Sequence, residues 1–535
     1  MESTTARRTV NRRVAGFALV GVVAVSAAVY LFTRHAGDSY VVDEWLFVAR
    51  RQDFSWSSLV QGHNGHLTIV PAFVYLVVWN TFGLGAYWVF RLVAVVWQVA
   101  TALAVGEVIR RRHGLVPALV GTLIVTVSGT GSENSLFGFQ ISFMGGLLFF
   151  VCSVLCLDEA ESTGLRRWDV AAFVAVCLAV GSSGSGVPAI PAVMLLIASR
   201  PGRLRRAWII VPTLVAYAAW YSRYSITFET THPGPSQFVS FAVDGLAGSL
   251  AGIAGVDLMW GRIALGAVAV LVVRDVVRRG FDLRRHIWTV YLLSFWALTS
   301  YSRATFGDAL ASRYLWVGMF CFPMIIAESI PRKVLDRRRT TALSIVGACA
   351  VVLFTWGTQP ELSANLRFQR NEADVSIGFT RVALANRDRL DPELGLYAFV
   401  PGYPLINARE FFSAVDRFGN PPEWNSATWL DTESRRYGAD RAFIGYGLAD
   451  PRPAIGECTR GDEVGSVAVA PGATGRFEVL EEAGVVLTRF REPGATFDFN
   501  VRLLEPGTYE IDFVDDGLGS DVTATFNGGR VVACG

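Results

Sequence analysis

The stretch that decides the fold is residues 14–32, VAGFALVGVVAVSAAVYLF. It contains no charged residue, and its length is close to the roughly 20 residues that a helix needs to cross a bilayer. Four arginines precede it, namely Arg7, Arg8, Arg12 and Arg13. Arginines before a span favour a cytoplasmic N-terminus. No small-residue cleavage site stands out before His35, so we expect a retained membrane anchor.

Composition extends this prediction to most of the chain. The 535 residues are 52% hydrophobic, with a mean hydropathy of +0.38, which is typical of a polytopic membrane protein. Residues 358–535 hold 17 Arg against 27 Asp and Glu, so they carry −10, while residues 1–357 carry +12. We therefore expect a basic-looped membrane module over 1–357 and an acidic soluble part after it. Nothing indicates nucleic-acid binding.

Basic clusters predict the topology, because cytoplasmic loops collect arginine. After Arg110, each interval between clusters holds two apolar segments: 115–128 and 141–157, 169–182 and 187–199, 207–220 and 259–273, 287–300 and 313–330. A last span over 341–357 leads outward. Before Arg110 there are three segments, 14–32, 66–82 and 87–109, although two cytoplasmic ends require an even number. The middle one is short and contains Pro71, so we expect it to lie in the membrane interface. The result is about eleven spans, with the N-terminus cytoplasmic and the C-terminal part extracytoplasmic.

This topology places the polar loops on the extracytoplasmic side. They cover 33–85, 129–140, 182–186, 221–255 and 301–312. The stretch 221–260 is polar at first and then rich in Gly and Ala. A mobile lid over a substrate and a disordered loop are both compatible with it.

Asp43 and Glu44 follow the first span in VVDEWLFVARR, residues 41–51. The segment predicts a short amphipathic helix at headgroup level. Either carboxylate could act as a general base on a sugar or lipid hydroxyl, with a pKa raised by partial burial. Alternatively, Asp43 caps the helix and Glu44 interacts with its dipole.

Two further loops carry candidate substrate-binding residues. His63 and His66 lie in QGHNGHLT, residues 61–68, and Glu133 lies in GTGSENSLFGFQ, residues 129–140. The histidines suit hydrogen bonding to a sugar or phosphate oxygen, and their spacing fixes no third ligand, so we expect no metal site. Glu133 could support an acceptor or a cation. The alternative for all three is ordinary polarity at a membrane surface.

Arginines flank the external loop YSRATFGDALASRYLW, residues 301–316. Arg303 and Arg313, next to Tyr314, offer forks that match a phosphate group. Arg223, in WYSRYS, is a further candidate of this kind. Snorkelling toward anionic lipid is the alternative. Arginine on this side runs against the positive-inside trend, which favours function.

The tail predicts two extracytoplasmic regions. Residues 358–457 mix an amphipathic pattern with short strand-like runs, which indicates a mixed α/β region. Residues 458–535 alternate apolar and polar residues between Pro-Gly and Asp-Gly turns, which is typical of a β-sandwich. Cys458 and Cys534 bracket it, so we expect a disulfide. This region could bind a glycan, or it could simply pack on the membrane module.

Over about residues 10–357 this arrangement resembles the GT-C superfamily of membrane glycosyltransferases. The resemblance rests on the acidic pair after the first span, the interfacial segment 66–82, a span that opens with Arg91 and Leu92 and ends at a basic turn, and the acidic loop at Glu133. Oligosaccharyltransferase catalytic subunits also carry acids in that loop. The phrases HNGHLT, ENSLFGFQISF and ALASRY are similar to those of uncharacterised bacterial members.

The resemblance implies an inverting sugar transfer from a polyprenyl-phosphate donor to an envelope glycan or glycolipid acceptor at the membrane. Asp43 or Glu44 would be the base, and Arg303 or Arg313 would hold the departing phosphate. Many metal-using relatives separate their two acids by one residue, so the adjacent pair here argues against a divalent cation, and no cofactor is expected. The Lys-Pro-Pro element of lipid A aminoarabinose transferases is absent, with Gly65 and His66 in its neighbourhood, so the donor sugar is not implied.

Three other functions share these features. A ligase that moves a whole glycan would use the same loops. A transporter or flippase would need polar residues at the midplane, for which Asp257 and Arg262 are the candidates. A non-catalytic membrane scaffold with a glycan-binding tail is the third.

Overall fold

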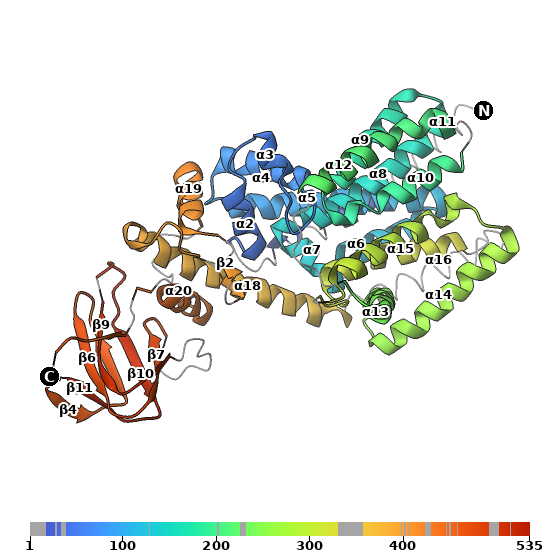
Figure 1. Cartoon of the computed structure of the whole chain (residues 1–535). Helices are drawn as coiled ribbons and strands as arrows, with labels where there is room; N and C mark the ends of the chain where they lie inside the picture. The colour runs from blue at the N-terminus through green and yellow to red at the C-terminus, as the bar shows by residue number, and fades with distance from the viewer. Residues whose placement is uncertain are drawn as a thin grey trace. The chain divides into compact units, whose positions relative to one another are not determined.

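The computed structural model describes most of the chain, in two compact units. The described residues are 18–26, 29–30, 32–33, 39–127, 129–200, 203–224, 232–305, 307–329, 357–396, 398–400, 403–404, 406–422, 430–445, 447–448, 451–456, 458–491, 502–513 and 515–534. The first unit comprises Met1–Ala36, Asp53–Val77 and Trp88–Arg367, and the second comprises Gly37–Gln52, Val78–Tyr87 and Phe368–Gly535. The fold is mostly helical with a C-terminal β region, which confirms the predicted class (Figure 1). The domain boundaries at 357 and 457 stay predictions.

The first unit is a helix bundle. Its longer helices are α5 (Tyr87–His113), α6 (Leu115–Val127), α8 (Ile141–Thr163), α9 (Arg166–Val180), α10 (Ala189–Ala198), α12 (Val211–Tyr224), α13 (Pro235–Ala254), α14 (Leu258–Arg279), α15 (Leu283–Arg303) and α16 (Ser312–Ser329). Every span predicted between 87 and 330 overlaps one of them. Nearly all of the span predicted over 341–357 lies outside the described residues. The number of spans therefore stays a prediction.

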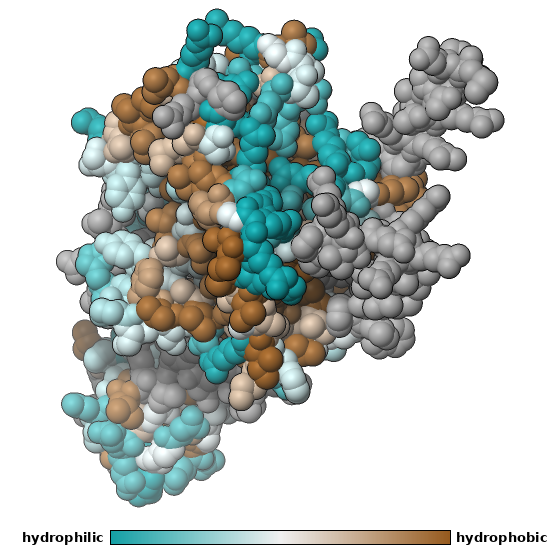
Figure 2. Space-filling model, turned by 90° about the vertical axis from the view of Figure 1, so that its right-hand side faces the viewer, coloured by the Kyte–Doolittle hydropathy of each residue, from teal (hydrophilic) through white to brown (hydrophobic). Residues whose placement is uncertain are grey.

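Hydropathy and exposure agree with a membrane location. Within the described ranges, three helical segments are long and apolar enough to cross a bilayer: Tyr87–His113, Gly138–Thr163 and Pro235–Ala254. In addition, α14 leaves Met259, Ile263, Val270 and Val277 more than half exposed. Large apolar side chains along one helix are stable in this position when lipid covers them. Figure 2 shows hydrophobic residues beside hydrophilic ones on one face of the molecule.

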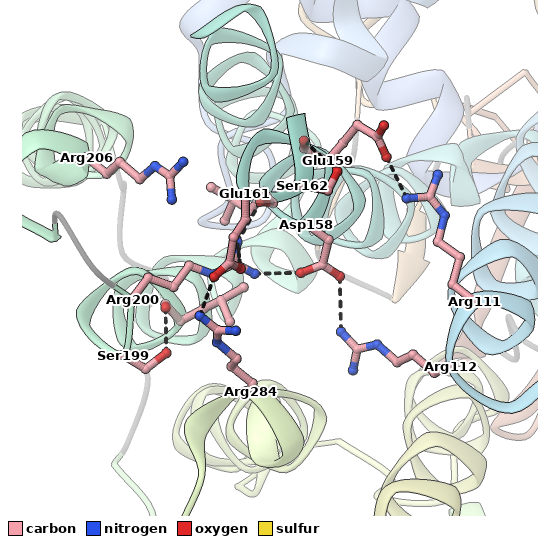
Figure 3. Close-up of polar contacts among 12 residues, drawn as sticks. Arg111, Arg112, Asp158, Glu159, Glu161, Ser162, Ser199, Arg200, Arg206 and Arg284 are labelled. Carbon is pink, nitrogen blue, oxygen red and sulfur yellow. Dashed lines mark hydrogen bonds and ion pairs between the residues drawn. The ribbon is translucent and has the colours of Figure 1, made fainter. Parts of the chain in front are cut away.

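Three of the predicted cytoplasmic clusters, those of Arg112, Arg200 and Arg284, meet at one end of the bundle, here called the basic end. The clusters predicted at residues 7–13 and 332–339 lie outside the described residues. Arg200, just after α10, contacts Asp158 near the end of α8 at 2.6 Å (Figure 3). Arg112, near the end of α5, contacts Asp158 at 3.3 Å and Glu328 of α16 at 2.8 Å. Arg284, at the start of α15, reaches α8 through Glu161 at 2.6 Å. These ion pairs join five helices at the ends that the topology places on one side.

The opposite end, here called the loop end, carries the turns between helices. It includes the short helices η1 (Gly129–Gly131), α7 (Ser132–Leu136), η2 (Gly138–Gln140) and η3 (Gly184–Gly186). The helix α4 (Ile69–Phe82) also begins here, because Val70 donates its N–H to the Gly181 carbonyl at 2.9 Å. At 14 residues α4 is shorter than a span, and Phe73 and Val77 are exposed one turn apart. The position of α4 in the membrane interface stays a prediction.

Helix α13 corrects the prediction of an external loop over 221–255. Pro235 at its first position and the left-handed Gly255 after its end bound 20 helical residues. Its glycines form a packing face: a Cβ atom at Gly245 would clash with Trp296, and one at Gly252 would clash with Thr130. Small residues allow helices to approach closely. The Gly and Ala content that suggested a loop therefore builds a helix contact.

Both ends of α13 lie at the loop end. Gln237, in its first turn, donates to the carbonyl of Ala304, which follows α15, at 2.7 Å. Thr130 donates to the carbonyl of Gly252, near the end of α13, at 3.3 Å. The helix therefore runs along this end and does not join it to the basic end, and Figure 1 shows α13 nearly down its axis. The two predicted crossings between Arg206 and Arg274 stay a prediction.

The second unit combines helices with a β-sandwich. Its helices are α2 (Val42–Arg50), most of α18 (Gln359–Ala385), α19 (Ala408–Phe418) and α20 (Glu433–Gly445), with the short strand pair β1 (Ala398–Val400) and β2 (Tyr403–Pro404). Trp45 of α2 is fully buried, donates to Ser376 Oγ at 2.7 Å and packs against Phe379 and Phe411. The helix after the first span is thus part of this unit's core.

The sandwich has two antiparallel sheets. One has the order β5-β10-β7-β8 and the other β3-β9-β6-β11-β4. The strands are β3 (Arg452–Pro453), β4 (Arg460–Glu463), β5 (Ser466–Val469), β6 (Thr474–Val479), β7 (Ala483–Thr488), β8 (Arg502–Leu504), β9 (Gly507–Asp512), β10 (Val522–Asn527) and β11 (Val531–Cys534). The predicted disulfide between Cys458 and Cys534 is confirmed.

A buried polar cluster fixes the sandwich to α20. Arg489 has no exposed side-chain surface and holds both oxygens of Asp516 at 2.7 Å. Asp440 of α20 accepts backbone N–H groups from Arg489, Phe490 and Arg491 at 3.0, 2.8 and 3.2 Å. Burial, partly opposed by these bonds, raises the pKa of Asp440 to about 6. The sandwich is therefore built into the second unit through buried hydrogen bonds.

Candidate functional site

The two predicted catalytic acids occupy different environments on α2. Glu44 is fully buried, and its Oε2 accepts the Val41 N–H and the Tyr87 hydroxyl, each at 3.0 Å. The first of these bonds satisfies an unpaired backbone donor before the helix. Asp43, one residue earlier, is partly exposed. Glu44 therefore has the structural role that was the alternative to catalysis, while Asp43 has access to solvent.

His63 and His66 form the ends of a tight turn at the loop end. Each backbone N–H donates to the other residue's carbonyl, at 3.0 and 2.9 Å. The two residues between them, Asn64 and Gly65, have φ values of 50° and 77°, as a two-residue hairpin requires. A directly paired arrangement places both imidazoles on the same face of the turn. The ring of His63 packs against Phe139 at 4.9 Å between centroids.

His66 is a neutral imidazole next to a positive charge. Burial, followed by the charges of Arg303 and His63, lowers the pKa of His66 to about 3. A Cβ atom at Gly184 would lie 2.7 Å from the His66 ring, so only glycine leaves room for the ring. At neutral pH His66 therefore acts as both hydrogen-bond donor and acceptor. Arg303, the last residue of α15, supplies the charge.

Glu133 and Arg313 form a second cluster at the same end. Arg313 donates through Nη1 to Glu133 Oε1 at 2.7 Å and through its backbone N–H to Oε2 at 3.3 Å. Ser312 donates to the Thr130 carbonyl at 2.6 Å, and Asn134 donates to the Arg313 carbonyl at 3.1 Å. These bonds attach the 130–134 turn to the start of α16 and fix the orientation of the guanidinium.

Sequence reasoning missed three polar partners of this cluster. Gln140 donates to Glu133 at 3.2 Å, and Thr130 donates to Glu361 at 2.8 Å. Asn365, four residues after Glu361 on α18, donates to Ser132 at 2.7 Å. Burial raises the pKa of Glu361, although the Thr130 bond opposes this. The one available signal was the helical spacing of Glu361 and Asn365, which places both on one face of α18.

The remaining predicted residues lie nearby in the first unit. Tyr314 is buried against Phe143 and Trp296. Arg223 is exposed near the end of α12 and stacks on Tyr224 at 5.9 Å. This end of α12 contacts the chain before His63, because Trp220 donates to the Val60 carbonyl at 2.7 Å.

The first unit thus brings the predicted residues together in two neighbouring clusters. His63, His66 and Arg303 form one, and Glu133 and Arg313 form the other. The segment from Glu133 to Gln140 joins them, since Phe139 contacts His63 while Gln140 contacts Glu133. Asp43 belongs to the second unit. Among the described residues, no three His, Cys, Asp or Glu side chains are grouped as metal ligands.

Comparisons with known proteins give structural likeness alone. No family model matches the chain, and no curated protein matches it. The solved structures that are similar include ArnT from Cupriavidus metallidurans in the apo state, with a TM-score of 0.47 and 14% identity over 76% of this chain and 90% of that one. The same protein bound to undecaprenyl phosphate gives a TM-score of 0.46 and 15% identity over 77% and 91% of the two chains. At these scores the likeness supports no inference about function.

Proposed function

We propose that this chain is a GT-C-type membrane glycosyltransferase that transfers a sugar from a polyprenyl-phosphate donor to a glycan or glycolipid acceptor on the extracytoplasmic face. The observation that carries the proposal is the His63–His66 turn with Arg303 at the loop end. It combines a phosphate-binding cation with the neutral imidazole of His66 and the ring of His63, both of which can hydrogen-bond sugar hydroxyls. All three lie at the end of the bundle opposite the cytoplasmic charge clusters.

Arg303 is the proposed anchor of the donor phosphate. Its charge acts directly on His66, so a phosphate bound there would contact a cation and a neutral donor together. Arg313 is already paired with Glu133 at 2.7 Å, which offsets part of its attraction for an anion. We assign Arg313, Tyr314 and Arg223 to the outer part of the donor site, where they orient the headgroup.

Asp43 is the proposed general base, because Glu44 is buried and serves α2. The Asp43 carboxylate takes the proton from an acceptor hydroxyl, and the hydroxyl oxygen attacks the anomeric carbon from the face opposite the phosphate. The bond from that carbon to the phosphate oxygen breaks, and polyprenyl phosphate leaves with the bonding electrons. Arg303 stabilises the charge on the leaving group. The product has inverted anomeric configuration.

Two features support an extracytoplasmic location of the chemistry. The Cys458–Cys534 disulfide is of the kind that persists in oxidising compartments. The ion-paired arginine clusters at the basic end follow the positive-inside trend. Membrane lipid surrounds the apolar helices and delivers the donor laterally.

The test is sugar transfer by the purified protein in lipid nanodiscs, with a panel of polyprenyl-phosphate sugars. We expect Asp43→Asn to abolish transfer while donor binding survives, and Arg303→Ala to weaken donor binding. Asp257→Asn is the matched control, since Asp257 is an exposed acid at the start of α14. Transfer that persists in Asp43→Asn would overturn the assignment of the base.

Translocation of a lipid-linked glycan is the main alternative to sugar transfer. Arg262, one of the two residues that suggested a transporter, is ion-paired with Asp244 of α13 at 2.7 Å. The pair has an evident structural role between α13 and α14. Movement of a lipid-linked glycan across liposomes, without any transfer product, would replace the proposed activity.

A further inference from the structure

We propose that a groove in the second unit binds the glycan chain of the acceptor and holds it in register with Asp43. This inference rests on the proposed function. The groove has a volume of about 630 Å³ and is lined by Gln52, Arg387, Asp388, Leu390, Pro392, Arg409, Phe412, Ser413, Asp416 and Arg417. The volume is in the range of ligand sites.

Part of the lining is held rigidly. Arg387 makes a two-pronged contact with Asp416, at 2.7 and 2.6 Å, and stacks on Phe412 at 5.0 Å. Arg409 pairs with Glu393 at 2.6 Å. The two-pronged pair of Arg387 fixes the direction of the remaining N–H donors of its guanidinium, whereas Arg409 makes a single contact and is mostly exposed. The groove therefore presents donors that need little ordering when a ligand arrives.

Other groups in the lining are available to a ligand. Arg417 and Asp388 make no ion pair or hydrogen bond with any residue that the structure describes. The first offers five N–H donors and the second offers acceptor oxygens only. A ligand with many hydroxyl groups can satisfy both, because each hydroxyl donates and accepts.

The shape and charge of the groove favour a saccharide chain over other polymers. It is open to solvent, whereas small molecules are usually enclosed. The arginines and aspartates of the lining nearly cancel, unlike the basic tracks that hold nucleic acids. None of its lining residues belongs to a strand, so it offers no strand edge to which a peptide could pair.

Hydrogen bonds link the groove to α2, the helix that carries the proposed base Asp43. Gln52, just past the end of α2, donates to the Glu410 carbonyl at 3.2 Å and accepts from Ser413 at 2.8 Å. Asp43 lies in the first turn of the same helix. At 1.5 Å per residue, about 13 Å of chain axis separates Asp43 from Gln52. Since both belong to the second unit, an acceptor bound in the groove keeps a constant distance from Asp43.

The experiment measures glycan binding by the full-length protein in nanodiscs on an array of acidic and neutral bacterial oligosaccharides. The variants are Arg417→Ala and Arg409→Ala. Arg452→Ala is the control, because Arg452 and Arg409 are exposed to a similar extent and each pairs with one acid. We expect binding to fall at least tenfold in both groove variants and to remain unchanged in the control.

The outcomes separate this inference from the proposed function. Binding that survives in both groove variants, or no binding to any glycan on the array, overturns the groove. Groove-dependent binding by a protein that transfers no sugar supports the groove and rejects the transferase. A preference for acidic over neutral glycans that Arg417→Ala removes would further support the assignment and identify the charge of the acceptor.

Discussion

The two ends of the helix bundle use arginine in different ways. At the basic end Arg112, Arg200 and Arg284 each contact acids of neighbouring helices, and Arg200 is almost fully buried. At the loop end Arg313 also pairs with an acid, Glu133, but Arg303 lies near the neutral imidazole of His66. Ion pairs among helix ends hold the bundle in one arrangement, while a cation beside neutral donors suits an anionic ligand. The comparison separates the ion-pairing arginines of the basic end from Arg303, whose role in donor binding is the proposal above.

Removal of Arg200 should give the largest effect on stability. Arg200→Ala removes a buried guanidinium that contacts Asp158 and Glu161 at the end of α8, and it leaves Arg112 and Arg284 as the remaining partners of these two acids. Because both acids keep a second arginine, we expect the loss to be that of the charge-assisted hydrogen bonds of Arg200, about 1.5–3 kcal/mol. Thermal unfolding in nanodiscs measures it, with the half-exposed Arg262→Ala as control, expected to cost less than about 1 kcal/mol. Equal losses in the two variants would contradict a special role for the basic end.

The loop end should show the opposite pattern. Arg303→Ala removes the proposed electrostatic stabilisation of the leaving phosphate, so kcat/KM for transfer should fall on the order of 100-fold. The midpoint of thermal unfolding should change little. Arg223→Ala, at an exposed site, should reduce transfer much less. A large loss of stability in Arg303→Ala would make this arginine structural and remove the contrast between the ends.

Acid should loosen the loop end through His66. Its folded-state pKa of about 3 lies below the unfolded value near 6.5. The contribution of neutral His66 to the free energy of unfolding is therefore complete above pH 6.5. It is lost as the pH falls from 6.5 toward 3, because the unfolded state then binds a proton that the folded state excludes. The slope is at most about 1.4 kcal/mol per pH unit. Unfolding free energies of wild type and His66→Asn over this range measure it, and identical pH profiles would refute the lowered pKa of His66.

Loss of an exposed ion pair at the basic end should have the smallest effect on stability. Arg111 contacts Glu107 and Glu159 at 2.6 and 2.9 Å but keeps 41% of its side chain exposed. Arg111→Gln should therefore cost about 0.5 kcal/mol, and 1 M salt should remove the difference from wild type. A cost as large as that of Arg200→Ala would show that burial does not separate the two.

The sequence predicted what depends on composition and charge. Apolar runs located the helices. Arginine clusters predicted that the basic loops lie at the same end of the bundle. Helix α13 was missed because Gly245, Gly248 and Gly252 lower its hydropathy while they enable its packing. Glu44 could not be told from Asp43, since the distinction depends on Tyr87, 43 residues away. For the same reason the contacts of Glu361 and Asn365 with the 130–134 turn could not be predicted.

The disulfide sets an order of events in biosynthesis. The two cysteines are 76 residues apart, and all strands from β4 to β11 lie between them or at the second cysteine. With the proposed extracytoplasmic location, the bond can close only after β11 has been synthesised and translocated, and it then destabilises the unfolded chain by about 4–5 kcal/mol. Until that moment the strands must find their partners without the covalent restraint. In that topology, oxidation of this pair is a late and measurable marker that the C-terminal strands have been completely translocated.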